Sequence, residues 1–151
     1  MRHLGIDYGT RRVGLAVSDE GGRFATPLEV LEVGSPQQAL EGVAAAVAEE
    51  GAEILVIGLP LNMDDSEGPA AVAVRRWADD LSARTGRQTV LVDERLSSFE
   101  AELTLRSRKQ AGERLTRRGK KRRLDALAAA QLLQGYLDGT LRPIPAKANE
   151  E

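Results

Sequence analysis

The sequence predicts one α/β domain, built on a mixed sheet of five strands with helices on both faces. Its 151 residues match the usual size of a single domain, and a hydrophobic fraction of 42% is enough for a core. Segments with a two-residue period come first, and segments with helical spacing then alternate with short apolar runs. We expect residues 1–138 to form this domain and residues 139–151 to form a loose C-terminal tail.

The first three strands are expected to form an antiparallel meander. Residues 3–8 and 12–18 predict a hairpin, because they flank a Gly-Thr-Arg turn and the second segment repeats its large apolar residues with a period of two. Residues 22–33 predict a third, irregular strand, in which Pro27 favours an edge position or a bend.

Helices and strands alternate in the middle of the chain. A Ser-Pro pair at 35–36 fits a helix start, and Gly51 fits the end of that helix. Residues 53–59 contain an unbroken apolar run, which is typical of a central strand covered on both faces. A second helix is predicted over residues 69–85, and the last strand over residues 88–93.

Two more helices are expected after that strand. Ser97 and Glu100 fit a capping box for a short helix, and residues 120–137 are rich in Ala and Leu, which favour a long helix. A three-strand meander followed by alternating helices and strands is the order of ribonuclease H-like domains. We therefore expect a ribonuclease H-like fold.

The composition excludes several kinds of site. The chain has no cysteine, which excludes a disulfide framework, a thiolate zinc site, an iron–sulfur cluster and a cysteine nucleophile. Gly-rich phosphate loops of the Walker and dinucleotide types do not occur. No signal-like N-terminus and no apolar run of about 18 residues occurs, so we expect a cytoplasmic protein without a membrane partner.

Basic residues are concentrated in one segment. Residues 106–123 carry ten Lys or Arg and one acid, a formal charge of +9, whereas the rest of the chain carries −11. Such a run becomes favourable beside a polyanion, because each neutralised phosphate releases counterions. Nucleic acid is therefore the expected partner, and a solvated basic helix face is the alternative.

Asp7 ends the first predicted strand, on a face with few large side chains. By alternation this face also carries Gly5, and the next strand places Gly14 and Ala16 beside it. Small neighbours leave room for a phosphate or a metal ion, and a carboxylate binds divalent cations through oxygen. A carboxylate that caps the turn before Gly9 explains the pattern equally well.

Asp125 lies in the predicted long helix. Helical spacing puts it on one face with Ala129 and Leu132, which are expected to be buried. A carboxylate aimed at an apolar surface needs a partner or a metal ion. The alternatives are an exposed Asp paired with Lys121 and a helix N-cap.

Four other acids are candidates. Asp93 and Glu94 close the last strand, and since successive strand residues point to opposite faces, at most one can join Asp7 without a bulge. Spacing leaves that choice open, and either acid can instead pair with a neighbouring arginine or cap the next helix. Asp64 and Asp65 fit an Asx turn better than a metal site.

The remaining reactive side chains have structural explanations. His3 is the only histidine of the chain and lies early on a strand, so a His-dependent triad is poorly supported. Ser97 and Ser98 fit the helix cap and have no evident base. Trp77 is expected in the core.

Four segments together resemble the YqgF family, also called RuvX. They are LGIDYGTRRVGLAVSD, VIGLPLNMDDSEGPAA, VDERLSSFEAE and KKRRLDALAAAQLLQGYL, and they extend over residues 3–138. The family is described as a pre-16S rRNA nuclease and a Holliday junction resolvase homologue with a ribonuclease H-like fold. The resemblance implies that Asp7, Glu94 and Asp125 are the catalytic acids, and it favours Glu94 over Asp93.

Two positions depart from the family's pattern. Asp65 stands where Gly is expected after Asn-Met-Asp, and Ser97-Ser98 stand in place of Thr-Thr. The hydroxyl groups are kept at the second position. The first substitution bears on the backbone geometry of the loop, because Asp adopts a left-handed conformation less readily than Gly.

The resemblance and the three acids point to metal-assisted hydrolysis of phosphodiester bonds. We expect a site for two Mg²⁺ or Mn²⁺ ions, bridged by Asp7 and completed by Glu94 and Asp125. Resolution of a four-way junction needs two cuts, which makes a homodimer a candidate assembly. Six basic residues are expected to contact phosphates or to steer nucleic acid to the acids: Arg11, Arg12, Lys120, Lys121, Arg122 and Arg123.

Two other functions fit parts of the sequence. A non-catalytic RNA-binding or ribosome-assembly factor could keep the fold and the acids without turnover. The GIDYGT segment is similar to a phosphate motif of sugar kinases and Hsp70-like ATPases, but an ATP-binding phosphotransfer domain normally needs a second phosphate loop and a second domain of the same fold.

Overall fold

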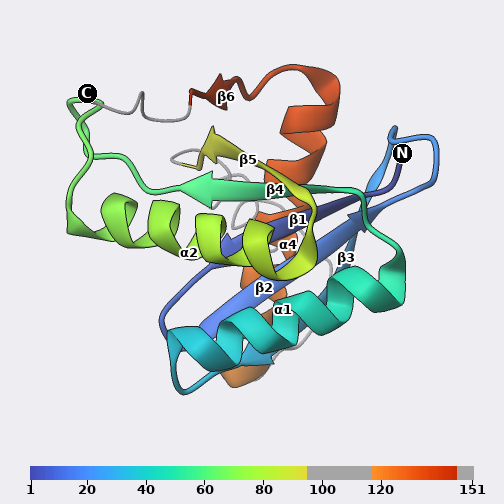
Figure 1. The fold of residues 1–151 in the computed structure, drawn as a ribbon, viewed down its shortest axis with the longest axis horizontal. Coiled ribbons are helices and arrows are strands. Elements are labelled where there is room, and N and C mark those ends of the chain that lie inside the picture. The colour runs from blue at the N-terminus through green and yellow to red at the C-terminus, as the bar shows by residue number, and fades with distance from the viewer. Residues whose placement is uncertain (95–116, 146–151) are drawn as a thin grey trace.

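The computed structural model describes residues 1–94 and 117–145, and the side chains in the second range from residue 125 on. A six-stranded sheet has the order β3-β2-β1-β4-β5-β6. Helices α1 and α2 cover one face and helix α4 covers the other (Figure 1). The elements are β1 (His3–Tyr8), β2 (Arg12–Ser18), β3 (Ala25–Glu32), α1 (Pro36–Glu50), β4 (Ile54–Leu59), α2 (Pro69–Thr85), β5 (Gln88–Asp93), α4 (Arg117–Asp138) and β6 (Pro143–Ile144).

The first three strands form the predicted antiparallel meander. β1 pairs with β2 so that Asp7 lies opposite Gly14. β2 pairs with the edge strand β3, and the register shifts between Leu15 and Ala16, where Pro27 lies opposite. Proline cannot donate a ladder hydrogen bond, so the edge position and the local irregularity predicted for Pro27 are both confirmed.

The helices begin and end where the sequence places their caps. Ser35 caps α1, and its hydroxyl accepts a hydrogen bond of 3.1 Å from the amide of Gln38. Gly51 then adopts a left-handed conformation with φ 65°, which ends the helix and turns the chain into β4. β4 lies centrally, because it pairs in parallel with both β1 and β5.

Two cores lie on opposite faces of the sheet. On the side of α1 and α2, β1 and β4 contribute large residues such as Leu4, Ile6 and Ile57, all fully buried. On the side of α4, the strands contribute Ala16 and other small or medium side chains. The alternation of strand residues separates these two sets, so Asp7 falls on the α4 face.

Within the described residues the sheet has six strands, one more than predicted. Residues 143–144 form β6, which pairs antiparallel with Leu91 and Val92 of β5. These residues belong to the segment for which the sequence predicted a loose tail, and a two-residue strand has no periodicity that reveals it. The short helix predicted after Ser97 lies outside the described residues. No helix in the described ranges is long and apolar enough to cross a membrane.

Candidate active site

Asp7 occupies the carboxyl end of β1 on the face that α4 covers. The residues beside it are small, as predicted: Gly14 lies opposite on β2, and Gly5 lies two residues earlier opposite Ala16. A side chain at Gly5 would lie 2.7 Å from Leu133 Cβ and 2.8 Å from the carbonyl oxygen of Ala129. Glycine is therefore required for α4 to lie this close to the strand that carries Asp7.

Glu94 directly follows β5 and makes a hydrogen bond with Asp7. Room for it comes from Gly58 on the neighbouring strand, where a Cβ would lie 2.6 Å from Glu94 Oε2. Asp93 lies on the other side of the chain and lines a separate pocket. The structure thus pairs Glu94, and not Asp93, with Asp7, which is the choice that the family resemblance favoured.

Proximity and burial change the protonation of this pair. Burial is the main cause that raises the pKa of Asp7 to about 6, and the charge of Asp125 raises it further, whereas the hydrogen bond from Glu94 lowers it. Burial also raises the pKa of Glu94 to about 8, together with the charges of Asp7 and Asp93. At neutral pH the Glu94 carboxyl group is therefore protonated and donates a hydrogen bond to the Asp7 carboxylate.

Asp125 reaches the same region from α4. The helix backbone lies so close to β2 that a Cβ at Gly14 would collide with the carbonyl oxygen of Asp125. Its carboxylate accepts a hydrogen bond from Arg12, with 2.7 Å between Arg12 Nε and Asp125 Oδ2. Their side chains are 35% and 27% exposed, so the ion pair lies at the rim of the acid pair.

The three acids supply the oxygen donors that hard divalent cations prefer. Asp7 and Glu94 already contact each other, and Asp125 is near enough for its charge to raise the pKa of Asp7. Among the described residues no three acids or histidines converge closely enough to form a ready metal centre. In the structure the Asp125 carboxylate faces Arg12. The three acids would therefore hold a divalent cation together only after that carboxylate turns toward Asp7.

The predicted basic residues have different placements. Arg12 opens β2 and pairs with Asp125, whereas its neighbour Arg11 is exposed in the turn before it. The four basic residues Lys120, Lys121, Arg122 and Arg123 belong to the N-terminal half of α4, but their side chains lie outside the described part of the structure. The alternative pairing of Asp125 with Lys121 is therefore not described, whereas the pairing with Arg12 is.

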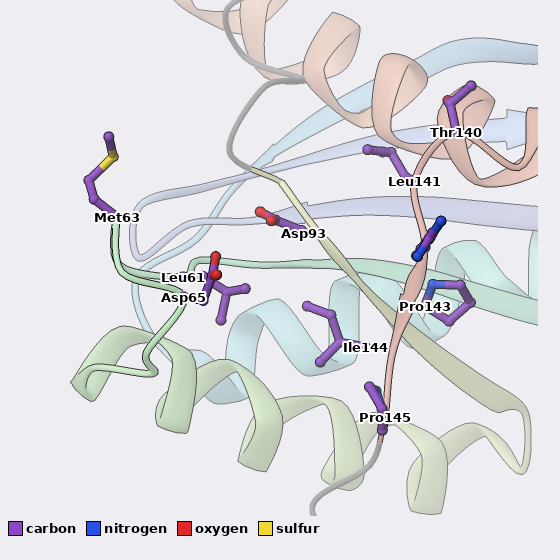
Figure 2. A pocket seen from close by; sticks show the side chains of 10 residues that line it. Leu61, Met63, Asp65, Asp93, Thr140, Leu141, Pro143, Ile144 and Pro145 are labelled. Atoms are coloured by element: carbon purple, nitrogen blue, oxygen red, sulfur yellow. The ribbon is translucent and has the colours of Figure 1, made fainter.

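A pocket of about 790 Å³ borders the site on the side of Asp93. Figure 2 shows Asp93 between two groups of lining residues: Leu61, Met63 and Asp65 from the loop after β4 on one side, and Leu141, Pro143, Ile144 and Pro145 on the other. Its walls are mainly apolar side chains and prolines. Asp93 therefore contributes to a different surface from its neighbour Glu94.

Several structural interpretations from the sequence are confirmed. Asp64 forms the expected Asx turn and accepts a hydrogen bond of 3.1 Å from the amide of Ser66. At the position where the family pattern has Gly, Asp65 does adopt a left-handed conformation, with φ 68°, so the substitution does not prevent this backbone geometry. Trp77 is buried, and the ring of His3 lies 5.9 Å from that of Tyr136. Ser97 and Ser98 lie outside the described residues.

Two features of the site escaped the sequence analysis. The ion pair between Arg12 and Asp125 joins residues 113 positions apart, and no local spacing reveals it. Gly58 makes room for Glu94, and its signal was present, because a glycine inside an apolar strand often marks a close approach.

Solved structures support the fold class. Thermus thermophilus RuvC matches with a TM-score of 0.57 and 21% identity, over 95% of this chain and 100% of that chain. The fowlpox virus Holliday junction resolvase matches with a TM-score of 0.55 and 10% identity, over 92% of this chain and 99% of that chain. At these identities the likeness concerns the fold, and it confirms the predicted ribonuclease H-like α/β class.

Sequence comparisons extend the likeness to a family. The family described as "RuvX: Holliday junction resolvase" matches residues 1–139. A protein of Anaeromyxobacter sp. (strain Fw109-5) called "Putative pre-16S rRNA nuclease" is 46% identical over 139 residues, 92% of this chain and 98% of that protein. A protein of the same name from Acidiphilium cryptum (strain JF-5) is 40% identical, over 95% of this chain and 88% of its own length. With four sequence motifs in order and a match over nearly its whole length, the chain belongs to the RuvX family.

Proposed function

We propose that the protein is a metal-dependent endonuclease that hydrolyses phosphodiester bonds in structured nucleic acid. The observation that carries the proposal is the contact between Asp7 and Glu94, two partly buried carboxyl groups with the charge of Asp125 nearby. Its proposed substrates are the 5′ end of pre-16S rRNA, a four-way DNA junction, or both. With such substrates, the protein is proposed to act in the cytoplasm.

Asp7, Glu94 and Asp125 are the proposed ligands for Mg²⁺ or Mn²⁺. When bound, two such ions would lower the pKa of an attacking water molecule and stabilise the leaving oxygen. No serine, cysteine or histidine nucleophile is required, which agrees with a chain that has no cysteine and one histidine.

The chain's own residues have separate tasks in this reaction. Glu94 has to lose its proton before its carboxylate can act as a ligand, and Asp7 accepts the hydrogen bond that holds that proton. Arg11 and Arg12 are proposed to hold the substrate phosphates next to Asp7. The basic residues at the start of α4 are proposed to steer nucleic acid toward Asp125.

The decisive experiment is a cleavage assay with Mn²⁺ on a four-way DNA junction and on a pre-16S rRNA fragment. We expect cleavage of at least one substrate, and a loss of roughly 100-fold or more when Asp7→Asn or Asp125→Asn removes a charge from the cluster. Binding of the same substrates is expected to stay nearly unchanged. Asp64→Asn is the matched control, because it removes an exposed loop carboxylate and keeps the acceptor of its turn.

Other outcomes point to other functions. Tight binding of pre-rRNA without Mn²⁺-dependent cleavage would identify a non-catalytic RNA-binding or assembly factor instead. An absolute requirement for ATP would favour phosphotransfer chemistry. Light scattering of the complex with a junction will tell whether two copies bind, as coordinated cuts on two strands require.

A further inference from the structure

We infer that Arg12 couples metal binding to phosphate binding by exchanging Asp125 for a substrate phosphate. This inference rests on the proposed function, because it assigns a second task to an acid of the proposed metal site. In the structure Asp125 is held by Arg12 at 2.7 Å. A divalent cation would bind this carboxylate, and a substrate phosphate would bind this guanidinium.

The placement of Arg12 follows from the fold. Arg12 and Gly14 lie on the same face of β2 by alternation, and Gly14 is where α4 passes closest to the strand. The backbone of Asp125 packs against Gly14 at that crossing, so the carboxylate can change position only by rotation of its short side chain. It can accept from Arg12 at the rim, or it can turn toward Asp7.

Electrostatics makes these two positions compete. A guanidinium beside Asp125 neutralises the carboxylate and repels a divalent cation that approaches the same oxygens. Conversely, a cation bound at Asp125 repels the guanidinium. Arg12 then needs another anion, and a substrate phosphate accepts two parallel hydrogen bonds from arginine.

A reciprocal coupling follows. If a phosphate draws Arg12 away from Asp125, nucleic acid tightens metal binding, and metal tightens nucleic acid binding by the same factor. Arg12 would thereby limit metal loading until a substrate is present. The partial exposure of both side chains allows this exchange without unpacking of a core.

The test is a titration of the protein with Mn²⁺ alone, in which electron paramagnetic resonance measures the concentration of the free ion. Arg12→Gln is expected to tighten Mn²⁺ binding roughly tenfold, because it removes a positive charge next to the site. Arg12→Lys keeps the charge and is expected to stay within about threefold of the wild type. Arg84→Gln is the matched control, since Arg84 pairs with Glu41 on an exposed surface elsewhere, and we expect no change of more than about twofold.

The coupling itself is measured with a four-way DNA junction carrying phosphorothioate linkages around the crossover. The junction is expected to tighten Mn²⁺ binding to the wild type by roughly fivefold or more, and to Arg12→Gln by less than about twofold. Arg12→Met is a second variant, which keeps the packing of the side-chain stem. Thermal unfolding of each variant shows that it is folded.

The outcomes separate this inference from the proposed function. If Asp125→Asn weakens Mn²⁺ binding but Arg12→Gln leaves it unchanged or weakens it, the metal site stands and the exchange is wrong. An equal coupling factor in the wild type and in Arg12→Gln also overturns the exchange. If Asp125→Asn has no effect on Mn²⁺ binding, the proposed metal site itself fails.

Discussion

On the face of the sheet that α1 and α2 cover, the strands contribute large side chains, whereas on the face that α4 covers they contribute glycines and small or medium side chains. Leu4, Ile6 and Ile57 are fully buried on the first face. On the second face, Gly5, Gly14 and Gly58 lie against α4 or Glu94. Large apolar side chains contribute most to stability, whereas glycines and small side chains allow α4, with Asp125, to pack close to the strands. One face of the sheet thus provides most of the stability, and the other face carries the candidate site.

The largest loss of stability is expected on the first face. Ile57→Ala removes a fully buried side chain and leaves a cavity, so we expect the free energy of unfolding to fall by about 4 kcal/mol. Urea denaturation measures this change. The cleavage rate per folded molecule is expected to stay within about twofold of the wild type, and a large drop in that rate would break the separation of the two faces.

A smaller loss of stability with a larger loss of activity is expected on the second face. Gly14→Ala places a methyl group against the carbonyl of Asp125, so α4 must move, at a cost of roughly 3 kcal/mol. The movement displaces Asp125, and we expect cleavage to fall at least about 100-fold at a temperature where the variant is folded. Circular dichroism and the cleavage assay measure the two effects separately, and cleavage at the wild-type rate would contradict the prediction.

The acids predict an unusual dependence of stability on pH. The folded-state pKa values of Asp7 and Glu94, about 6 and about 8, lie above their ordinary values of 3.8 and 4.5. Between about pH 4 and pH 8 the folded protein therefore binds more protons than the unfolded chain, so stability falls as the pH rises. With a chelator present, we expect the free energy of unfolding, measured by urea denaturation, to fall by on the order of 2 kcal/mol between pH 5 and pH 8.

Asp7→Asn is the variant that checks this pH dependence. It removes the titration of Asp7 and its charge beside Glu94, so we expect the fall of the unfolding free energy over the same range to shrink by roughly half, and the burial of Glu94 to keep the remainder. Added Mn²⁺ is expected to restore stability to the wild type at pH 8 and not to this variant. Stability that rises between pH 5 and pH 8 in the wild type would show that the shared proton is assigned incorrectly.

The smallest effect is expected at a glycine outside the site. Gly42 lies inside α1, where a methyl group would meet only the tip of the Leu31 side chain, at 3.0 Å. That side chain is partly buried near the edge of the sheet and can move. Because alanine favours a helix more than glycine does, we expect Gly42→Ala to gain about 0.5 kcal/mol, seen as a small rise of Tm. A loss of more than about 1 kcal/mol would mean that this face is as tightly fitted as the other.

Local sequence patterns predict all the described helices and strands except β6, because the ends of these elements have local causes. Ser35 and Gly51 fix the ends of α1, and Pro27 marks the irregular edge strand. β6 was missed because its two residues depend on pairing with β5, which is distant in the chain. Long-range pairing leaves little trace in local composition.

The site was predictable only in part for the same reason. The small residues around Asp7 and the apolar face of α4 were readable from strand and helix periods. The choice of Glu94 over Asp93 needed the family resemblance, because alternation excludes one acid without naming it. The contact of Arg12 with Asp125 needed the folded chain.

Both outer strands of the sheet are unsuited to recruiting further strands. β3 is interrupted by a register shift beside Pro27, and β6 has only two residues, one of them Pro143. Such edges offer few consecutive free amide and carbonyl groups, a feature that protects proteins against fibril-like association. Two copies of this chain are therefore expected to meet through helices or loops and not by joining their sheets, which would leave the acids of each copy on its own α4 face.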